Sequence, residues 1–124
     1  MKDEQHCSGC HGALLPLSPS ELQCSLADLP GWTVEQVDGI NHLVQTFKFK
    51  NFIEAMAFTQ AVGALAEEYG HHPALLTEWG KVKVSWWTHK IKGLHANDTV
   101  MAAKTGLLFQ ARFEKDAIQW GGGD

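Results

Sequence analysis

The sequence predicts an α+β fold in which helices pack on one face of a four-stranded antiparallel sheet. Two observations predict it. Runs of alternating residues flank short turns that contain glycine, and longer segments carry apolar residues three and four positions apart. The resulting order is helix–strand–strand–helix–strand–strand–helix, which implies two hairpins in a single sheet.

The first helix and the first hairpin have clear local signals. Ser18-Pro19-Ser20-Glu21 is a capping box with proline at the first helical position, so we expect a short helix that ends near Leu29. Residues 32–37 alternate and are followed by Asp38-Gly39, a dipeptide typical of tight hairpin turns. The return strand should then run over residues 42–50.

The second half of the chain predicts a longer helix and another strand pair. Asn51 should cap a helix that ends at Gly70, with an apolar face made by Ala55, Phe58, Val62, Leu65 and Tyr69. Residues 75–79 and 82–89 predict strands around Gly80, with Trp86 and Trp87 packing on opposite sheet faces. A last helix should run from about Asn97 to Phe113 and bury Val100, Ala103, Leu107 and Ala111.

Length and composition indicate one globular domain. The chain has 124 residues, of which 44% are hydrophobic and 19% are charged. We expect a mobile N-terminal extension at residues 1–16, a single domain over residues 17–117 and a frayed tail at residues 118–124.

Charge and hydropathy argue against several classes of partner. The net charge is −4 and the ten Lys and Arg residues are scattered, so a direct nucleic-acid ligand is not expected. No apolar run approaches the roughly 18–20 residues of a membrane span, and the polar N-terminus leads into no signal-type stretch. We therefore expect a cytoplasmic protein without membrane attachment, whose three cysteines are reduced.

The N-terminal extension carries four residues that can bind metal, His6, Cys7, Cys10 and His11. The run from Cys7 to His11 matches the c-type haem attachment pattern, but haem attachment occurs outside the cytoplasm. The same side chains suit zinc, although four ligands within six residues would strain a tetrahedral site. We expect an unliganded tail, with an adventitious or structural metal as the alternative.

Three histidines form the candidate active site. His71 and His72 follow the second predicted helix, and His89 ends the last predicted strand. A hairpin centred on Gly80 would place His71 opposite His89. Imidazole donates and accepts protons near neutral pH, so converging histidines favour general acid–base catalysis over a purely structural role. Zinc bound by the histidines and Asp98 is the other alternative, but neighbouring residues of an extended segment point to opposite sides, and we expect no metal.

The same histidines carry a resemblance to a known family. The pattern Glu67-x-x-x-His71-His72-Pro73, followed by Trp79, His89, Gly93-Leu94 and Asp98, resembles the signature of the pterin-4a-carbinolamine dehydratases. Similar segments fall at Pro30-Gly31-Trp32, Phe47-Lys48-Phe49 and Asn51-Phe52, so the resemblance covers residues 18–113. One position departs from the family pattern. Three residues before the aspartate the family usually has a Ser or Thr that caps the last helix, and this chain has His95.

The resemblance implies a dehydratase of 4a-hydroxytetrahydropterins, which expels the 4a-hydroxyl as water and yields the quinonoid dihydropterin. The substrate is the product left by a pterin-dependent aromatic amino-acid hydroxylase, so the enzyme would serve pterin recycling. The leaving hydroxide gains a proton and N5 loses one, which requires neither a metal nor an organic cofactor. His71 and His89 would be the acid–base pair, each protonating the hydroxyl on a different pterin face.

The resemblance also implies four substrate-binding residues. His72 would bind the pterin ring, and Glu67 would orient a histidine. Asp98 would bind or polarise near the site, and Trp32 would form a wall against the flat pterin. Each has a structural alternative, which is an exposed helix acid for Glu67, a first-turn acid favoured by the helix dipole for Asp98, and core packing for Trp32.

Similar proteins form dimers and tetramers, so we expect a homodimer or a homotetramer, and the predicted sheet has no obvious edge protection. A second class of function is an interaction module. The same fold acts as a dimerisation cofactor of a homeodomain transcription factor, and relatives that lack the histidines assist assembly of a carbon-fixing enzyme. The complete set of histidines favours the enzyme and leaves a regulatory role as the alternative.

Overall fold

The computed structural model describes residues 15–113, and the chain divides into two compact units. Their described parts are residues 15–44 with 86–103 in the first unit and residues 45–85 with 104–113 in the second. Most of the predicted N-terminal extension and the whole predicted C-terminal tail lie outside the described residues. Within residues 15–113, no helix is long and apolar enough to cross a lipid bilayer.

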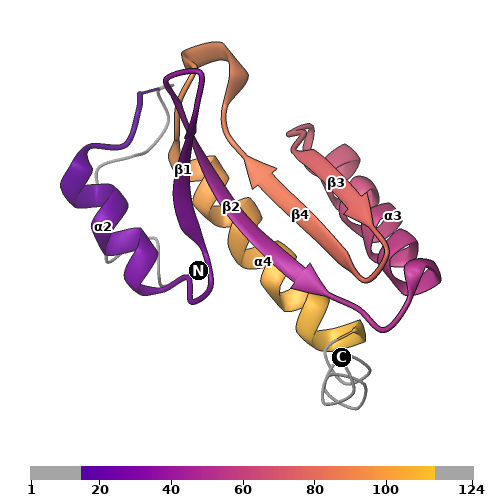
Figure 1. Cartoon of the computed structure of the whole chain (residues 1–124). Coiled ribbons are helices and arrows are strands. Elements are labelled where there is room, and N and C mark those ends of the chain that lie inside the picture. The colour runs from indigo at the N-terminus through magenta and orange to yellow at the C-terminus, as the bar shows by residue number, and fades with distance from the viewer. Residues whose placement is uncertain (1–14, 114–124) are drawn as a thin grey trace. The chain divides into compact units, whose positions relative to one another are not determined.

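The order of the elements confirms the predicted α+β fold. The helices are α2 (Pro19–Ala27), α3 (Phe52–Tyr69) and α4 (Ala96–Arg112), and a short 3-10 helix, η1 (His89–Ile91), precedes α4. The strands are β1 (Thr33–Val37), β2 (Ile40–Lys48), β3 (Ala74–Glu78) and β4 (Lys81–Trp86). They form one four-stranded sheet of antiparallel hairpins in the order β1-β2-β4-β3 (Figure 1). The elements β2, β4 and α4 each contribute residues to both units.

In the first unit, α2 and the first hairpin form where their local signals predict. The Ser18 N–H donates to Glu21 Oε1 at 2.8 Å, and the Glu21 N–H donates to Ser18 Oγ at 3.2 Å, which completes the capping box of α2. Asp38 and Gly39, with φ of 53° and 80°, form the turn between β1 and β2. Two consecutive positive φ values match the twist of a tight antiparallel hairpin.

Two expectations about cysteine have different outcomes. Cys24, on α2, is disulfide-bonded, so the expectation that the three cysteines are reduced is wrong. The candidate ligands at His6, Cys7, Cys10 and His11 lie outside the described residues.

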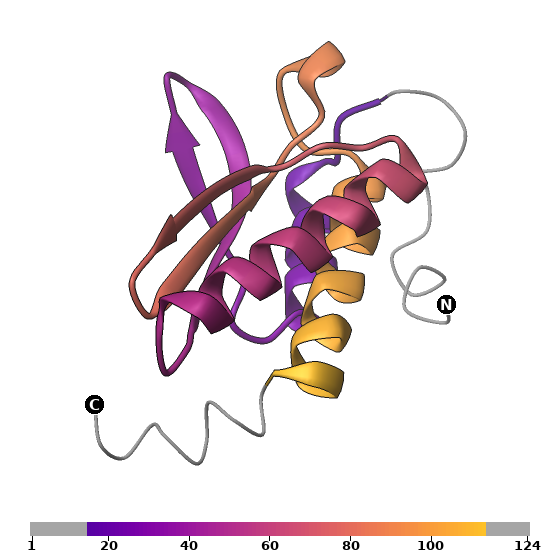
Figure 2. The same cartoon turned by 90° about the vertical axis from the view of Figure 1, so that its right-hand side faces the viewer.

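In the second unit, α3 and the end of α4 cover one face of β2. The Asn51 side chain accepts a hydrogen bond from the Glu54 N–H at 2.8 Å and caps α3. Phe47 packs on Phe58 of α3 and on Phe109 of α4, with both pairs of ring centroids 4.9 Å apart. Figure 2 shows α3 and this part of α4 on the same side of the strands. The unit therefore has an aromatic core between sheet and helices.

The predicted buried face of α4 is wrong. Leu107, expected in the core, is 60% exposed, whereas Met101, Thr105 and Phe113 are buried. Because each residue turns a helix by about 100°, a shift of one or two positions exposes a different stripe. The Phe109 ring contacts Phe47, Phe49 and Phe58, and such large aromatic surfaces outweigh the smaller side chains on which the prediction rested.

The second hairpin is also shorter and shifted by one residue. Leu75 pairs with Val84, whereas the predicted register paired it with Ser85. β4 ends at Trp86, because the backbone of Thr88 pairs with Gly93 instead of continuing the sheet. The prediction that His89 lies on a strand is therefore wrong.

Candidate active site

His71 and His72 lie directly after the end of α3. Gly70 adopts the left-handed conformation, with φ of 63°, and its N–H donates to the Glu67 carbonyl at 3.3 Å. The His71 N–H donates to the Ala66 carbonyl at 3.1 Å. These two bonds form a Schellman motif, which fixes the path of the chain leaving the helix. His71 is half-buried and His72 is exposed, so adjacent imidazoles have different access to solvent.

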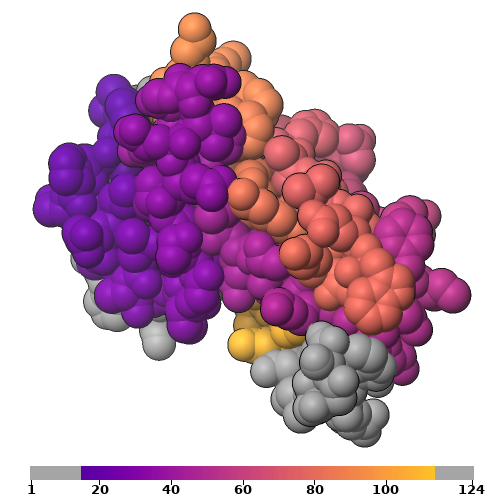
Figure 3. All heavy atoms as spheres, in the orientation of Figure 1, coloured from indigo at the N-terminus to yellow at the C-terminus, as the bar shows by residue number. Residues whose placement is uncertain are grey.

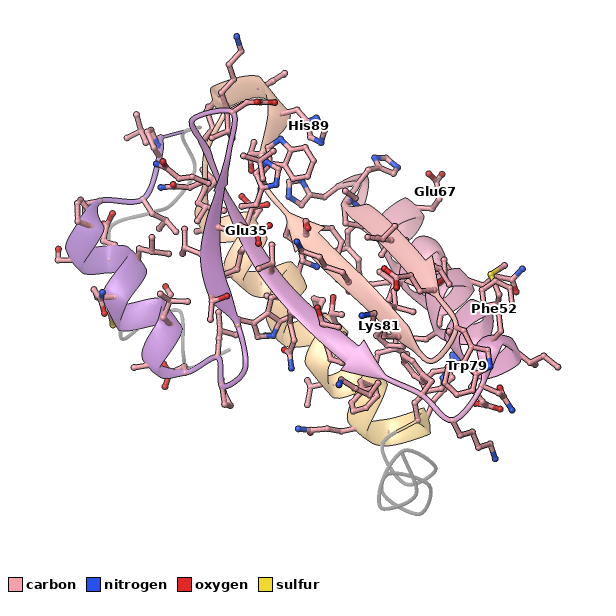
Figure 4. The ribbon with its side chains drawn as sticks, viewed as in Figure 1. Glu35, Phe52, Glu67, Trp79, Lys81 and His89 are labelled. Atoms are coloured by element: carbon pink, nitrogen blue, oxygen red, sulfur yellow. The ribbon has the colours of Figure 1, made fainter. Side chains whose placement is uncertain are left out.

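Glu67 and His72 form a direct side-chain pair. His72 Nε2 lies 2.7 Å from Glu67 Oε2, and both side chains are mostly exposed. Figure 4 shows Glu67 projecting outward from α3. An exposed pair of this kind contributes about 0–1 kcal/mol to stability. Its main consequence is therefore to restrict the orientation of the His72 ring.

His89 lies in the loop that follows β4. The loop is closed at its base, where the Thr88 N–H donates to the Gly93 carbonyl at 2.8 Å. His89 begins η1, and its exposed side chain is labelled in Figure 4. The His89 ring stacks on the Trp87 ring, with centroids 4.5 Å apart and planes at 27°.

Asp98 is completely buried and fixes the base of the same loop. Asp98 Oδ2 accepts hydrogen bonds from Thr88 Oγ1 at 2.7 Å and from the His95 N–H at 2.9 Å. Hydrogen bonds to a carboxylate are stronger than those between neutral groups. The structure thus joins Asp98 to the residue that immediately precedes His89, and places its carboxylate away from solvent.

His95 caps α4 in place of the Ser or Thr that is usual in the family. Its Nδ1 accepts a hydrogen bond from the Asn97 N–H at 3.0 Å, while Asp98 accepts from the His95 N–H. The bond from the His95 N–H to Asp98 is the one that a capping box has, whereas the imidazole accepts from the second helical residue, Asn97, and not from the third.

Trp32 is a buried residue of the first unit and is only 6% exposed. The backbone N–H of Trp32 donates to the Leu29 carbonyl at 3.1 Å in the turn after α2. Burial of this extent agrees with the core-packing alternative for Trp32.

Two features of the site were missed from the sequence. The Trp87 ring also stacks on His42 of β2, with centroids 3.8 Å apart and planes at 2°. Trp86 is fully buried, as expected for a packing residue, but Trp87 is half-buried between two imidazoles. The available signal was the alternation of the predicted strand over residues 82–89, which puts Trp87 and His89 on one face, although the observed β4 ends before both of them. Residues 15–113 contain no group of three His, Cys, Asp or Glu side chains placed to bind a metal ion.

Comparisons with known proteins agree on one family. A sequence model of the family described as Pterin 4 alpha carbinolamine dehydratase matches residues 15–108. A curated relative from Chlorobaculum tepidum, with the provisional name pterin-4-alpha-carbinolamine dehydratase, is 54% identical over 106 residues, covering 86% of this chain and 96% of the relative. Another of the same provisional name, from Saccharophagus degradans, is 52% identical over 107 residues, covering 86% and 95%.

A solved structure extends the similarity to the fold. The crystal structure of a transcriptional coactivator/pterin dehydratase from Brucella melitensis is 33% identical in sequence, with a TM-score of 0.67. The match covers 75% of this chain and 97% of that chain.

Proposed function

Since the chain belongs to the pterin-4a-carbinolamine dehydratase family, we propose that it is a hydro-lyase acting on 4a-hydroxytetrahydropterin. The products are water and the quinonoid dihydropterin. The observation that carries the proposal is the complete signature of His71, His72 and His89, with Glu67 in contact with His72. An interaction module would not require titratable side chains at these positions.

The proposed reaction combines the cleavage of one bond with two proton transfers. The bond between C4a and the hydroxyl oxygen breaks, the leaving hydroxide takes a proton and N5 gives one up. We assign these transfers to His71 and His89, each as the acid for a hydroxyl on one pterin face, because imidazole exchanges protons readily near neutral pH. The proton count balances without a metal or an organic cofactor.

The remaining predicted residues have supporting roles in this proposal. His72 binds the pterin ring, and Glu67 orients His72 through the 2.7 Å contact. Asp98, being fully buried, would contribute through the loop that carries His89, to which Thr88 connects it. Trp32 stays in the proposal as a wall of the pterin site, although its burial favours packing.

The proposal includes pterin recycling beside an aromatic amino-acid hydroxylase, in the cytoplasm. The substrate of such a dehydratase is what the hydroxylase leaves after turnover, so the two enzymes should act in the same compartment. Cell fractionation with thiol-specific labelling tests the location. Recovery of the protein in an oxidising compartment would contradict the cytoplasmic location.

A homodimer or homotetramer is also part of the proposal. β3 is an end strand of the sheet, and its alternation leaves Leu76 56% exposed. Figure 3 shows the side chains of β3 and of the turn after it at the surface. An end strand with apolar exposure is suited to pairing with a second copy of the chain.

A dehydration assay tests the proposed activity. The 4a-hydroxypterin is generated freshly, and its loss is followed with and without protein and with and without a chelator. Catalysis that a chelator does not affect is the expected result. Catalysis abolished by the chelator would contradict the metal-free mechanism.

A second candidate function is regulatory binding, and it is favoured by one observation. The similar protein from Brucella melitensis is described as both a transcriptional coactivator and a pterin dehydratase. Absence of dehydration by a protein with all three histidines intact would favour the binding function over the enzyme.

A further inference from the structure

Three rings of the first unit form a continuous stack. His42 lies on β2 and is only 8% exposed, Trp87 is half-buried, and His89 is exposed at the surface. The separations are 3.8 Å between the His42 and Trp87 centroids and 4.5 Å between the Trp87 and His89 centroids. The stack therefore runs from a buried imidazole, through an indole, to the imidazole that the proposed mechanism uses.

The backbone and the ring of His89 are fixed by different contacts. The backbone beside it is fixed by the Thr88–Gly93 pairing and by the hydrogen bond from Thr88 Oγ1 to Asp98. Neither contact determines the rotation of an exposed side chain about its own bonds. Stacking on the Trp87 ring restricts this rotation, because the other staggered orientations of the His89 side chain would take the imidazole off the indole face.

The position of Trp87 is itself fixed on its other side. The His42 and Trp87 planes differ by only 2°, so His42 supports the indole face opposite His89. His42 is the cross-strand partner of Glu35 in the β1–β2 hairpin, so the buried end of the stack belongs to the sheet. A stack that is buried at His42 and exposed at His89 is suited to holding the His89 ring in one orientation.

We propose that Trp87 is a positioning residue for His89 and that His42 acts through Trp87. The inference rests on the proposed function, because His89 is a proton-transfer residue only there. Proton transfer depends steeply on geometry, and a displacement of about 1 Å can cost on the order of a hundredfold in rate. An imidazole released from its stack should therefore slow the chemical step more than substrate binding.

The test compares Trp87→Leu with Trp87→Phe. Leucine fills space without presenting a flat face, whereas phenylalanine keeps a ring for His89 to stack on. Trp87→Leu should lower kcat about tenfold with KM changed less than about twofold, in line with the size of general acid–base contributions. Trp87→Phe should retain most of the rate.

A readout independent of catalysis accompanies the kinetics. The ring protons of His89, assigned by NMR with His89→Gln, should be shifted upfield by the indole ring current in the wild type. Trp87→Leu should abolish that shift. Absence of the shift in the wild type would overturn the stack, and a lost shift with unchanged kcat would overturn the positioning role.

Two further outcomes separate the inference from the function on which it rests. An inactive wild-type protein would overturn the proposed function and the positioning role with it, while full activity in Trp87→Leu would overturn the positioning role alone. If Trp87→Leu does not fold, His42→Ala provides the second test, because it leaves Trp87 and His89 in place. We expect it to lower kcat three- to fivefold, and an unchanged kcat would contradict the role of His42.

Discussion

The two imidazoles of the proposed acid–base pair are held by different means. The chain path at His71 is fixed by the Schellman motif that ends α3. His89 lies on a short loop, and its ring orientation depends on an aromatic neighbour. A substitution near His71 should therefore act through the backbone, whereas one near His89 should act through the side chain.

The first prediction concerns the division of labour between His71 and His89. If each is the acid for one pterin face, His71→Ala and His89→Ala should each lose at least about tenfold on one 4a-hydroxy stereoisomer and less on the other. The double variant should approach the spontaneous rate. Steady-state kinetics on the separated 4a-R and 4a-S isomers measure this. Equal losses on both isomers would contradict the division but leave the dehydratase assignment intact.

A second prediction uses the contact between Glu67 and His72. Removing the charge by Glu67→Gln should raise KM by about two- to fivefold with little change in kcat, because a ground-state contact is weakened. His72→Ala should change KM in the same direction and by more. Glu68→Gln is the matched control, since Glu68 is an exposed neighbour on α3 for which no contact with His72 occurs in the described residues. Equal effects of the two glutamine variants would contradict the orienting role of Glu67.

The site could be predicted from the sequence where its residues are close together in the chain. His71, His72 and Glu67 lie within six residues, and a helix end determines how they meet. The stack on Trp87 could not be predicted, because His42 reaches it from a different hairpin. Contacts between distant segments depend on packing that no local pattern contains.

At the scale of elements, the helix ends and most of the buried face of α3 were predictable, whereas the buried face of α4 was not. α2 and α3 begin and end within about two residues of the predicted positions, because caps are encoded by single residues such as Ser18, Asn51 and Gly70. The buried face of α4 depends instead on which side chains fill the core. The end of β4 depends on the backbone partner that Thr88 finds in Gly93.

The third prediction tests the unusual cap of α4. Serine and alanine at position 95 would leave similar voids where the imidazole packs, so the difference between His95→Ser and His95→Ala isolates the capping bond. We expect the alanine variant to be less stable than the serine variant by about 1 kcal/mol. Urea denaturation with equal m-values measures the difference. Equal stabilities would show that a side-chain acceptor at position 95 contributes nothing to the stability of α4.

At the scale of the whole molecule, the fourth prediction concerns self-association. Leu76→Lys places a charge on the end strand β3 and should shift the protein towards monomers, as measured by sedimentation velocity. Val37→Lys is the matched control, because Val37 is 40% exposed on β1 at the other end of the sheet. Dissociation by Val37→Lys alone would place the interface on β1, and no effect of either variant would contradict strand pairing.

The fifth prediction follows from the three elements shared by the two units, and it concerns cooperativity. Neither unit is a continuous stretch of chain, since β2, β4 and α4 each begin in one unit and end in the other. Melting either unit would leave half of a helix and parts of two strands without their partners, so a half-folded state should have little stability. We expect one unfolding transition, with fluorescence and far-UV circular dichroism coinciding. Two separated transitions would show that the units unfold independently.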